Sequence, residues 1–584
     1  MTLNRIHSWL PLAALLWLVL PVEALAQVDT TRSALPDIAP REVEIRGQLE
    51  ILLPSLRRQP LVGFNPPPRV PRPPAGRRPF AETYKQASAD LPASPLRRPS
   101  PPSALGAAYP AAQGLVESGV GRYFSRSVVA RIQVPLTNQT SFLLRTDYRG
   151  SDGHEPFDDT PDLNTPFDAV EGLIGVQRAG THWATGYIFS GFYESYDLYG
   201  AGPVVSDSLF RAQPDREGRG AVATLHLTTL ADTPVDARLD LSYGATRYKT
   251  LIIPVAIDPE GLIALSEQRF EADLDVSFPV EAGDVWIAGA ISAASLADGL
   301  GTYSAIDGGG GLRFQVGRTV TLSVGARFLG GFSDTETPRG SSDKIQIGYL
   351  SPDLHLEFLP APGVRLYARN RPGVEPNAVA DLFRINPYLT PQPELRPTLR
   401  TIDAEAGASV FAGPVQVAVK AGYQHMPQYL YFENDTGLFD RGITTLAYSK
   451  ADVAYAGGSV SVVFPGGLHA MVGATYRNGR LTEEDVDIPY FAPVLGETTL
   501  SYSFAQSRGL LQLTGHYESS RTIDRQQSRK VEAFFDLDVE ASYNVTPLLG
   551  VVFRVENING GNDTRWDNYP ESPYVIGAGL RVNW

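Results

Sequence analysis

The sequence predicts an all-β fold, a transmembrane antiparallel β-barrel of about 22 strands behind an N-terminal extended or disordered tail. Three observations lead to this prediction. From residue 114 onward, apolar and polar residues alternate in segment after segment, and none of the intervening stretches has a helical period. The connections tend to alternate between tight turns and longer loops. The last segment keeps alternating up to an aromatic residue at the C-terminus.

The N-terminus, residues 1–26, reads as a secretory signal peptide. Arg5 precedes an apolar run over 10–22, and Ala24-Leu25-Ala26 is a small-x-small cleavage site. No other stretch approaches about 18 continuous apolar residues, the length that a membrane-spanning helix needs. The mature chain is therefore expected to be exported.

Cysteine and charge exclude several classes of function. The 584-residue chain has no Cys, which rules out disulfides, thiolate metal sites and Cys nucleophiles. The net charge of -14 is uneven: -2 over 27–53, +7 over 54–102 and -19 over 103–584. The acidic body is a poor match for nucleic acid, and no nucleic-acid partner is predicted.

Residues 27–110 do not read as a folded domain. The first part, 27–53, is a short periplasmic segment, and its stretch 41–47 alternates as a short strand would. The second part, 54–110, is a Pro/Arg-rich linker expected to be extended. Strand addition to a partner's sheet is one reading of the first part, and a short ordering element of the tail is the other. The partner-binding candidates are Glu42, Val43, Glu44, Ile45 and Arg46.

The barrel, 111–584, is predicted from segments such as 535–545. There Phe535, Leu537 and Val539 fall on one face, and Asp536 and Asp538 fall on the other. Strands are expected near 114–124, 126–136, 140–150, 167–179, 183–197, 218–230, 235–248, 268–280, 284–297, 303–317, 320–333, 343–361, 363–372, 396–413, 415–432, 444–465, 468–480, 492–505, 508–520, 529–546, 548–560 and 573–584.

The connections indicate how these strands sit in a membrane. Tight turns such as 413–414 and 465–467 contrast with long loops such as 151–166, 198–217 and 373–395. Short turns at one end and long loops at the other are typical of outer-membrane barrels. A closed sheet also pairs every backbone group inside lipid. The apolar face is then expected to contact lipid, and the polar face to line the lumen.

Charged residues on the polar faces are the candidate lumen lining, expected to hydrate a solute pathway and bias which solutes pass. These candidates are Asp236, Arg238, Asp240, Asp273, Asp275, Glu405, Lys420, Asp536, Asp538, Glu540, Arg554 and Glu556.

The final strand carries a candidate signal for barrel assembly. An alternating apolar strand that ends in an aromatic residue is similar to the signal read by the bacterial barrel-assembly machinery. The residues of this signal are Tyr574, Ile576, Leu580, Val582 and Trp584.

Motifs over 380–584 resemble TonB-dependent receptors. The strand end 555–559, with Trp566 and the Tyr-Pro loop at 568–570, is similar to the end of those barrels. The Asn-Pro signature at 386–389 and the Leu-x-Pro signature at 393–397 are similar to their mid-barrel motifs. The resemblance implies a barrel of about 22 strands that takes a solute across the outer membrane. Only 84 residues, 27–110, precede the barrel, so the full plug domain of those receptors is not expected.

Candidate chemistry is sparse elsewhere. The eight histidines form no close ligand pair, and no catalytic triad spacing is found. The loop 147–168 is rich in carboxylates, which hold calcium in some proteins, but a solvated acidic loop is the preferred interpretation. No metal, cofactor or enzymatic activity is predicted.

Three functional readings follow. The first is passage or import of a solute across the outer membrane, and the second is a non-transporting barrel scaffold whose periplasmic tail recruits a partner protein. An outer-membrane enzyme is the least supported. The expected partners are outer-membrane lipid, the barrel-assembly machinery and a periplasmic protein on the tail. The expected location is the outer membrane of a Gram-negative-type bacterium, with the tail in the periplasm.

Overall fold

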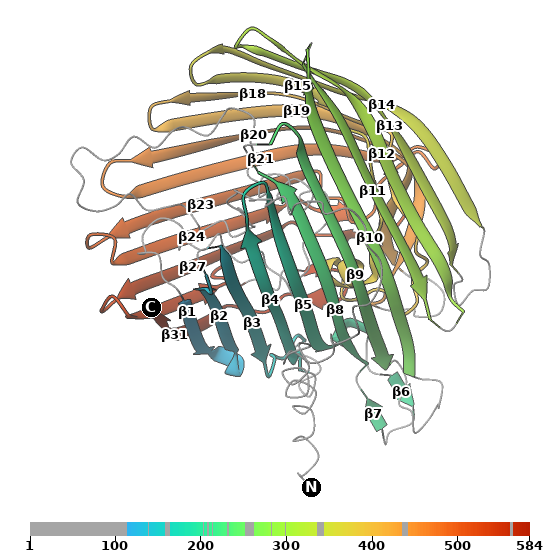
Figure 1. The fold of residues 1–584 in the computed structure, drawn as a ribbon. Helices are drawn as coiled ribbons and strands as arrows, with labels where there is room; N and C mark the ends of the chain where they lie inside the picture. Colours follow the sequence, from blue (N-terminus) through green and yellow to red (C-terminus); the bar gives the residue numbers. More distant parts are fainter. Residues whose placement is uncertain are drawn as a thin grey trace, which may run out of the picture. The chain divides into compact units, whose positions relative to one another are not determined.

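The computed structural model describes residues 114–584 except for 138, 158–163, 202–203, 207–209, 213, 231–232, 252–261, 282, 298, 336–343, 435–441 and 561–563. This part of the chain forms a closed antiparallel barrel of 22 strands (Figure 1). Each wall strand pairs with its neighbours along the chain, and the first, β1, pairs with the last, β31, from Leu115↔Asn583 to Gly121↔Gly577. The fold class predicted from the sequence is confirmed.

The wall strands are β1 (Gly114–Gly121), β2 (Arg126–Pro135), β3 (Thr140–Ser151), β4 (Phe167–Ala179), β5 (Trp183–Asp197), β8 (Asp215–Thr229), β9 (Asp236–Leu251), β10 (Leu262–Val280), β11 (Gly283–Leu296), β12 (Gly301–Val316), β13 (Val320–Thr335), β14 (Ile345–Ala361), β15 (Val364–Asn370), β18 (Ile402–Ala412), β19 (Val415–Asn434), β20 (Thr444–Phe464), β21 (Leu468–Leu481), β23 (Val494–Phe504), β24 (Gly509–Glu518), β27 (Phe534–Asn544), β28 (Leu549–Glu556) and β31 (Val575–Asn583).

Shorter elements lie in the connections. They are η2 (Arg122–Phe124), η3 (Tyr199–Ala201), β6 (Val204–Ser206), β7 (Phe210–Ala212), β16 (Gly373–Glu375), α4 (Val379–Ile385), β17 (Thr398–Arg400), β22 (Val486–Asp487), β25 (Arg521–Thr522), β26 (Lys530–Val531), β29 (Thr564–Trp566) and β30 (Tyr569–Pro570). The expectation of no helical segment between the strands is wrong at α4. No helix in the described ranges is long and apolar enough to cross a membrane.

The two ends of the barrel differ. At the short-turn end, strands are joined by connections such as 362–363 and 413–414, and this end carries Gly114 and Trp584. At the long-loop end, the connections include 152–166, 371–401 and 557–574. This layout is the one found in outer-membrane barrels.

Aromatic residues on the outer face mark two belts. On β5, Trp183 and Tyr193 are both exposed, and on β27 the exposed pair is Phe535 and Tyr543. The members of each pair are 8 to 10 residues apart, which is about 20–25 Å along the axis for strands tilted near 40°. The exposed apolar residues between the belts are Ile174, Phe189, Ile287, Val324, Val419, Val472, Leu511 and Val551, among others. The band therefore has the height of a hydrocarbon core.

Candidate functional site

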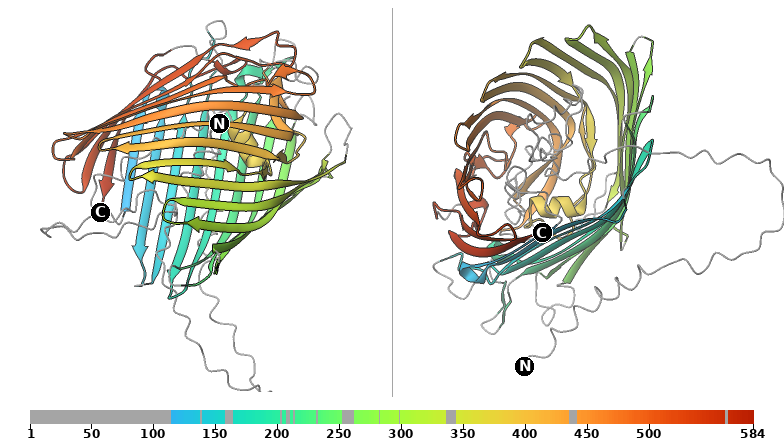
Figure 2. Two further views of the ribbon diagram at one scale, coloured as in Figure 1. Left: turned by 90° about the horizontal axis from the view of Figure 1, so that it is seen from above. Right: turned by 60° about the vertical axis from the view of Figure 1, so that its left-hand side comes forward.

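The lumen is narrowed by one connection that folds into the barrel, residues 371–401, here called the inward segment. Strands β15 and β18 are only 7 and 11 residues long, whereas the flanking β14 and β19 have 17 and 20 residues. The chain leaves the wall after Asn370 and returns at Ile402. In the right-hand view of Figure 2 the helix of this segment lies within the ring of strands.

Asn370 ends the ladder on both of its sides. Its side-chain Nδ2 donates to the carbonyl of Pro352 on β14 at 2.5 Å. Its Oδ1 accepts the backbone N–H of Asp403 on β18 at 3.0 Å. The side chain thus replaces backbone partners at the point where the wall strand stops, because the backbone groups at a strand end still need hydrogen-bond partners.

The sequence of the inward segment explains its irregular path. Six prolines, at 372, 376, 387, 391, 393 and 397, remove backbone donors and prevent a continuous ladder. Helix α4 lies between Pro376 and Pro387, and its apolar side chains Val379, Leu382 and Phe383 are buried. Their burial docks the segment onto the barrel interior.

A hydrophobic cluster, here called the mouth core, fills the lumen at the long-loop end. It joins side chains of the β5–β12 wall, the inward segment, the β19–β20 hairpin and three further loops. Its buried members are Tyr196, Leu198, Tyr248, Leu265, Ala294, Leu296, Tyr303, Val379, Leu382, Phe383, Tyr388, Leu389, Leu395, Leu430, Phe432, Ile443, Leu446, Tyr490, Ile523, Val531, Trp566 and Tyr569. The core therefore extends from one side of the wall to the other.

Arg216 of β8 fixes the inward segment to the wall. This guanidinium is fully buried, and its Nη2 donates to the carbonyl of Leu389 at 2.6 Å. Its Nη1 donates to the carbonyl of Pro387, and its Nε to Thr250 Oγ1 at 2.8 Å. The Phe383 ring lies 4.4 Å from the guanidinium carbon. The charge is therefore solvated by carbonyls and an aromatic face.

Other strands hold the segment as well. On β20, the Tyr448 hydroxyl accepts the N–H of Arg396 at 2.9 Å and donates to the carbonyl of Glu394 at 3.1 Å. On β13, Ser333 Oγ donates to the carbonyl of Leu395 at 2.6 Å. These contacts come from two sides of the barrel, so the segment is anchored across the lumen.

The outer part of the β19–β20 hairpin has both faces covered. A bulge between Met426 and Tyr429, around Pro427, changes the register there. Beyond it, Leu430, Phe432 and Leu446 belong to the mouth core. A second cluster covers the other side and consists of Met426, Tyr431, Ala451, Val453, Leu481 and Ile488. The hairpin is thus packed between the inward segment and the loop 482–493.

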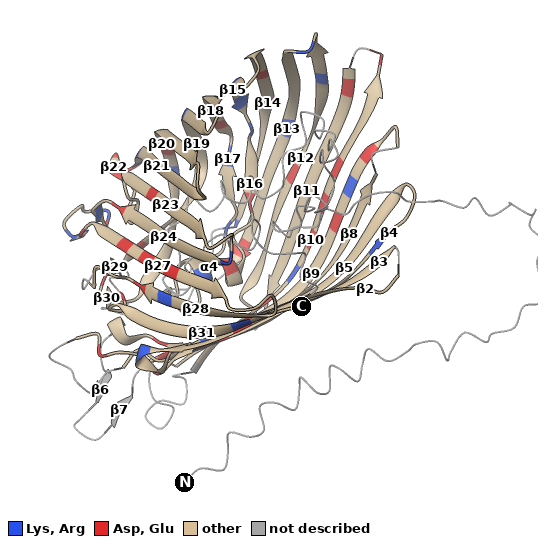
Figure 3. Ribbon diagram, turned by 90° about the vertical axis from the view of Figure 1, so that its left-hand side faces the viewer, with Lys and Arg blue, Asp and Glu red and all other residues tan. Residues whose placement is uncertain are grey.

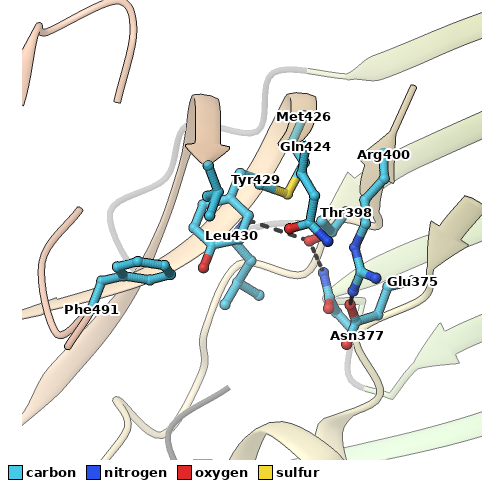
Figure 4. A pocket seen from close by; sticks show the side chains of 10 residues that line it. Glu375, Asn377, Thr398, Arg400, Gln424, Met426, Tyr429, Leu430 and Phe491 are labelled. Atoms are coloured by element: carbon cyan, nitrogen blue, oxygen red, sulfur yellow. Dashed lines mark hydrogen bonds and ion pairs between the residues drawn. The ribbon is translucent and has the colours of Figure 1, made fainter. Parts of the chain in front are cut away.

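A small pocket opens between the β16–β17 hairpin and β19 (Figure 4). Its polar rim includes the ion pair of Arg400 and Glu375, 2.6 Å apart, and Asn377, whose Nδ2 donates to Thr398 Oγ1 at 3.0 Å. Its apolar side contains Met426, Leu430, Val453 and Phe491. Two pairs of polar side chains on the rim are thus bonded to each other.

Charged residues occur along many of the wall strands (Figure 3). The register places the predicted lumen residues on the face opposite the exposed apolar residues, and several of them pair. Arg238 Nε donates to Asp240 at 2.7 Å, and His226 bonds the same carboxylate. Lys420 Nζ lies 3.8 Å from Glu405. Asp273 is directly opposite Asp240, and Asp275 is opposite Arg238. Asp536, Asp538 and Glu556 follow the same inward alternation, and Asp236 accepts from Thr229 at 3.4 Å.

Glu405 is the best-satisfied carboxylate of this set. The hydroxyls of Tyr367 and Tyr455 donate to its two oxygens, each at 2.9 Å, and Arg369 lies 2.8 Å from it. The two tyrosine rings lie over Gly407 and Gly422, where an added Cβ would overlap them. Here the glycines make room for the rings.

A second charged network closes the barrel seam. Glu117 of β1 pairs with Arg581 of β31 at 2.6 Å and with Arg554 of β28. Arg554 also donates to Glu540 of β27 at 3.0 Å. Two of these residues, Glu540 and Arg554, were predicted as lumen residues, and the structure adds Glu117 and Arg581. The network joins the first strand of the barrel to its last three.

The remaining candidates have different outcomes. Glu42, Val43, Glu44, Ile45 and Arg46 lie outside the described residues, so the partner-binding strand stays a prediction. The assembly-signal residues Tyr574, Ile576, Leu580, Val582 and Trp584 are all exposed on the outer face. Their recognition by the assembly machinery stays a prediction.

The acidic loop after β3 is described over 152–157 and 164–166. His154 is buried there, and Thr165 closes the loop base through its hydroxyl, 2.8 Å from His154 Nδ1. Burial and the nearby Arg122 lower the pKa of His154 to about 4. No group of three metal-ligating residues occurs in the described part of the chain.

The sequence did not indicate Arg216 or the other side chains that hydrogen-bond the inward segment. Arg216 follows the inward alternation of β8 in the structure, but the predicted strand begins at residue 218 and leaves Arg216 in the predicted loop 198–217. Its partners, Pro387 and Leu389, are 171 and 173 positions away, and no local pattern connects them.

This fold and this polar, loop-filled lumen define a closed outer-membrane-type β-barrel. No protein-family model matches the chain, and no curated protein matches it. The FrpB iron transporter from Neisseria meningitidis aligns with a TM-score of 0.64 at 12% identity, over 81% of each chain. The copper transporter OprC aligns with a TM-score of 0.62 at 11% identity, over 82% of this chain and 81% of that chain.

A point mutant of the ferric enterobactin receptor PfeA from Pseudomonas aeruginosa gives a TM-score of 0.60 at 12% identity, over 81% of this chain and 80% of that chain. The chain therefore has the barrel fold of the TonB-dependent receptors, as the resemblance of its motifs implied.

Proposed function

We propose that this protein imports or passes a solute across the outer membrane through a lumen that its own inward segment closes at rest. The observation that carries the proposal is the mouth core, which joins the β5–β12 wall to the β19–β20 hairpin. A solute crosses this level only when the inward segment moves. As in other outer-membrane barrels, the short turns are assigned to the periplasmic side and the long loops to the cell exterior.

The charged lumen and the fold support this proposal. Paired carboxylates and guanidinium groups keep a lumen hydrated and bias its ion preference. The similar structures are named as iron and copper transporters and as a receptor, which favours transport as the general class.

The test is conductance of the refolded protein in planar bilayers. Wild-type protein is expected to show almost no current, with rare openings. A variant in which a short turn replaces 371–401 is expected to form a large, steadily open pore. Leu399 of β17 and Gln428 of β19 are register partners. The described chain has no free cysteine, so the double variant Leu399→Cys with Gln428→Cys introduces a single reversible disulfide between these strands. The oxidised pair should abolish openings and reduction restore them. A large steady wild-type current would contradict the proposal.

The tail adds a second comparison. Its 54–102 stretch has a net charge of +7 and precedes the strand that begins at the short-turn end. We expect the tail in the periplasm, where residues 41–47 are available to a partner protein. A truncated variant that lacks 27–110, measured beside the full chain, tells whether the tail also limits current, in which case high salt should weaken the effect.

The alternative is a scaffold that does not transport and whose tail recruits a periplasmic partner. The dense anchoring of the inward segment by Arg216, Ser333 and Tyr448 favours this reading. It predicts no current from any variant that retains the inward segment, and loss of partner capture after deletion of 41–53.

A further inference from the structure

A patch of cations on the outer face of β8 and β9 lies near the long-loop end. Arg219 of β8 stands directly opposite Arg247 of β9, and both side chains are exposed. Lys249 follows Arg247 on the same face of the strand. Like charges placed directly across an antiparallel pair destabilise a sheet. This arrangement therefore costs stability unless an anion bridges the two strands.

The patch differs from three other outward cations near this end. Arg126 lies 3.4 Å from Asp168, Lys344 lies 2.8 Å from Asp334, and Arg480 lies 3.0 Å from Asp485. No comparable ion pair of Arg219, Arg247 or Lys249 occurs within the described residues. A phosphate group would supply the counter-charge that no described residue supplies through an ion pair.

The height of the patch matches a lipid headgroup. Tyr193, an aromatic residue of the upper belt, is the register partner of Arg219. Tyr243 and Phe270 form an exposed aromatic pair lower on the same face. Arg247 is four residues beyond Tyr243, which is about 10 Å farther along the barrel axis for a tilted strand. Aromatic belts mark the membrane–water interface, so the cations lie at the level of the headgroups.

The first carboxylate on this face occurs in the row of Lys249, one row beyond the two arginines. Glu217 is opposite Lys249, and Asp197 is opposite Asp215 one row beyond. The two arginines are therefore the charges nearest to the hydrocarbon band. A ligand that approaches from the membrane side meets them before it meets any of these acids.

We propose that Arg219, Arg247 and Lys249 form a binding site for the phosphate groups of an anionic lipid headgroup in the outer leaflet. Guanidinium groups bind phosphate oxygens through paired N–H donors, and a second arginine across the strand pair permits a bridged phosphate. The site rests on the outward orientation of the long loops used above, and it is separate from the lumen.

The experiment uses full-length protein in nanodiscs of phosphatidylcholine, with and without a bis-phosphorylated lipid A, and reads lipid retention by native mass spectrometry. Wild-type protein should retain lipid A and not phosphatidylcholine. A triple variant should retain lipid A about 100-fold more weakly, since each lost cation weakens binding about fivefold. Its substitutions are Arg219→Gln, Arg247→Gln and Lys249→Gln. Arg219→Lys with Arg247→Lys keeps the charges but not the paired donors, so its retention should lie between that of the triple variant and that of wild type.

The matched control is Arg480→Gln with Lys450→Gln, which removes two outward cations that are paired with Asp485 and Glu483. It should retain lipid A as wild type does. Equal retention by the triple variant and wild type would overturn the proposal. Displacement of lipid A by millimolar inorganic phosphate would overturn the assignment to a lipid and indicate a free-anion site. Conductance of the same variants separates this result from transport, because a lipid defect with normal currents leaves the lumen proposal intact.

Discussion

Arg216 donates to the carbonyl oxygen of Leu389 at 2.6 Å, a contact between the barrel wall and a loop 173 residues later in the chain. The same guanidinium also binds the carbonyl of Pro387. One buried side chain thus fixes the turn that follows α4. The inward segment has other anchors, and among them Arg216 contributes a fully buried guanidinium group.

Replacing Arg216 with Gln should loosen the inward segment. The change leaves at least one of two buried carbonyls without its donor, at a cost of about 1–3 kcal/mol each. We expect a lower melting temperature and more frequent channel openings in planar bilayers. Arg219→Gln is the control, because it removes the same charge three residues away on the outer face. Equal opening rates for both variants would show that Arg216 does not hold the segment.

The seam network should determine how firmly the barrel closes. Glu117→Gln removes the negative charge between Arg581 and Arg554 and leaves Glu540 as the carboxylate that both cations of the network share. Breaking a buried pair costs about 3–5 kcal/mol when the remaining charge has no partner, and Glu540 reduces this cost here. The folded band on unboiled SDS gels should convert to the unfolded band at a lower temperature.

Exchange of the two charges provides the control for the seam. Glu117→Arg with Arg581→Glu restores an opposite-charge pair across β1 and β31, and it should recover part of the lost stability. A double variant as unstable as the sum of both single changes would contradict a direct interaction.

His154 predicts an effect of pH on the loop after β3. Its pKa in the folded loop is about 4, below the ordinary 6.5, so the unfolded state takes up the proton first as the pH falls. His154 therefore does not lower the stability of the folded loop above pH 6.5. Between pH 6.5 and about 4, the folded loop loses up to about 3 kcal/mol of stability relative to the unfolded state. Limited proteolysis of the loop should accelerate over this range.

The comparison for this pH effect is His154→Gln, which has no proton to gain. Its proteolysis rate should change far less between pH 7 and pH 4.5. His469→Gln, a change at the other end of the barrel, should behave as wild type does. An identical pH profile for wild type and His154→Gln would rule out His154 as the cause.

Trp584 should matter for insertion more than for stability. Its backbone exchanges two hydrogen bonds with Gly114, at 3.0 and 3.1 Å, while its ring is 47% exposed on the outer face. Trp584→Ala keeps the backbone bonds and removes the terminal aromatic ring, so we expect slower assembly into the outer membrane. Trp183→Ala removes an outer tryptophan at the same end, and pulse-chase insertion assays should show a smaller effect. Equal delays would contradict a terminal signal.

The wall could be predicted from the sequence because period two determines both strand and face. For β4 and β5 the predicted bounds, 167–179 and 183–197, are the observed ones. The filled mouth could not be predicted, because α4 spans only seven residues, less than two full helical turns. Proline marks the inward segment as irregular, but no local pattern says whether an irregular loop projects outward or folds into the lumen.

The early end of β15 also leaves part of a neighbouring strand without a second partner. Within the described residues, β14 pairs with β15 only from Leu354 onward, while Ile345–Asp353 pair with β13 alone. An open strand edge is a template on which a neighbouring barrel in a crowded membrane adds a strand of its own. Pro352 has no N–H to offer there, and Asn370 already occupies its carbonyl. The end of this open stretch next to β15 is thereby protected against pairing between copies.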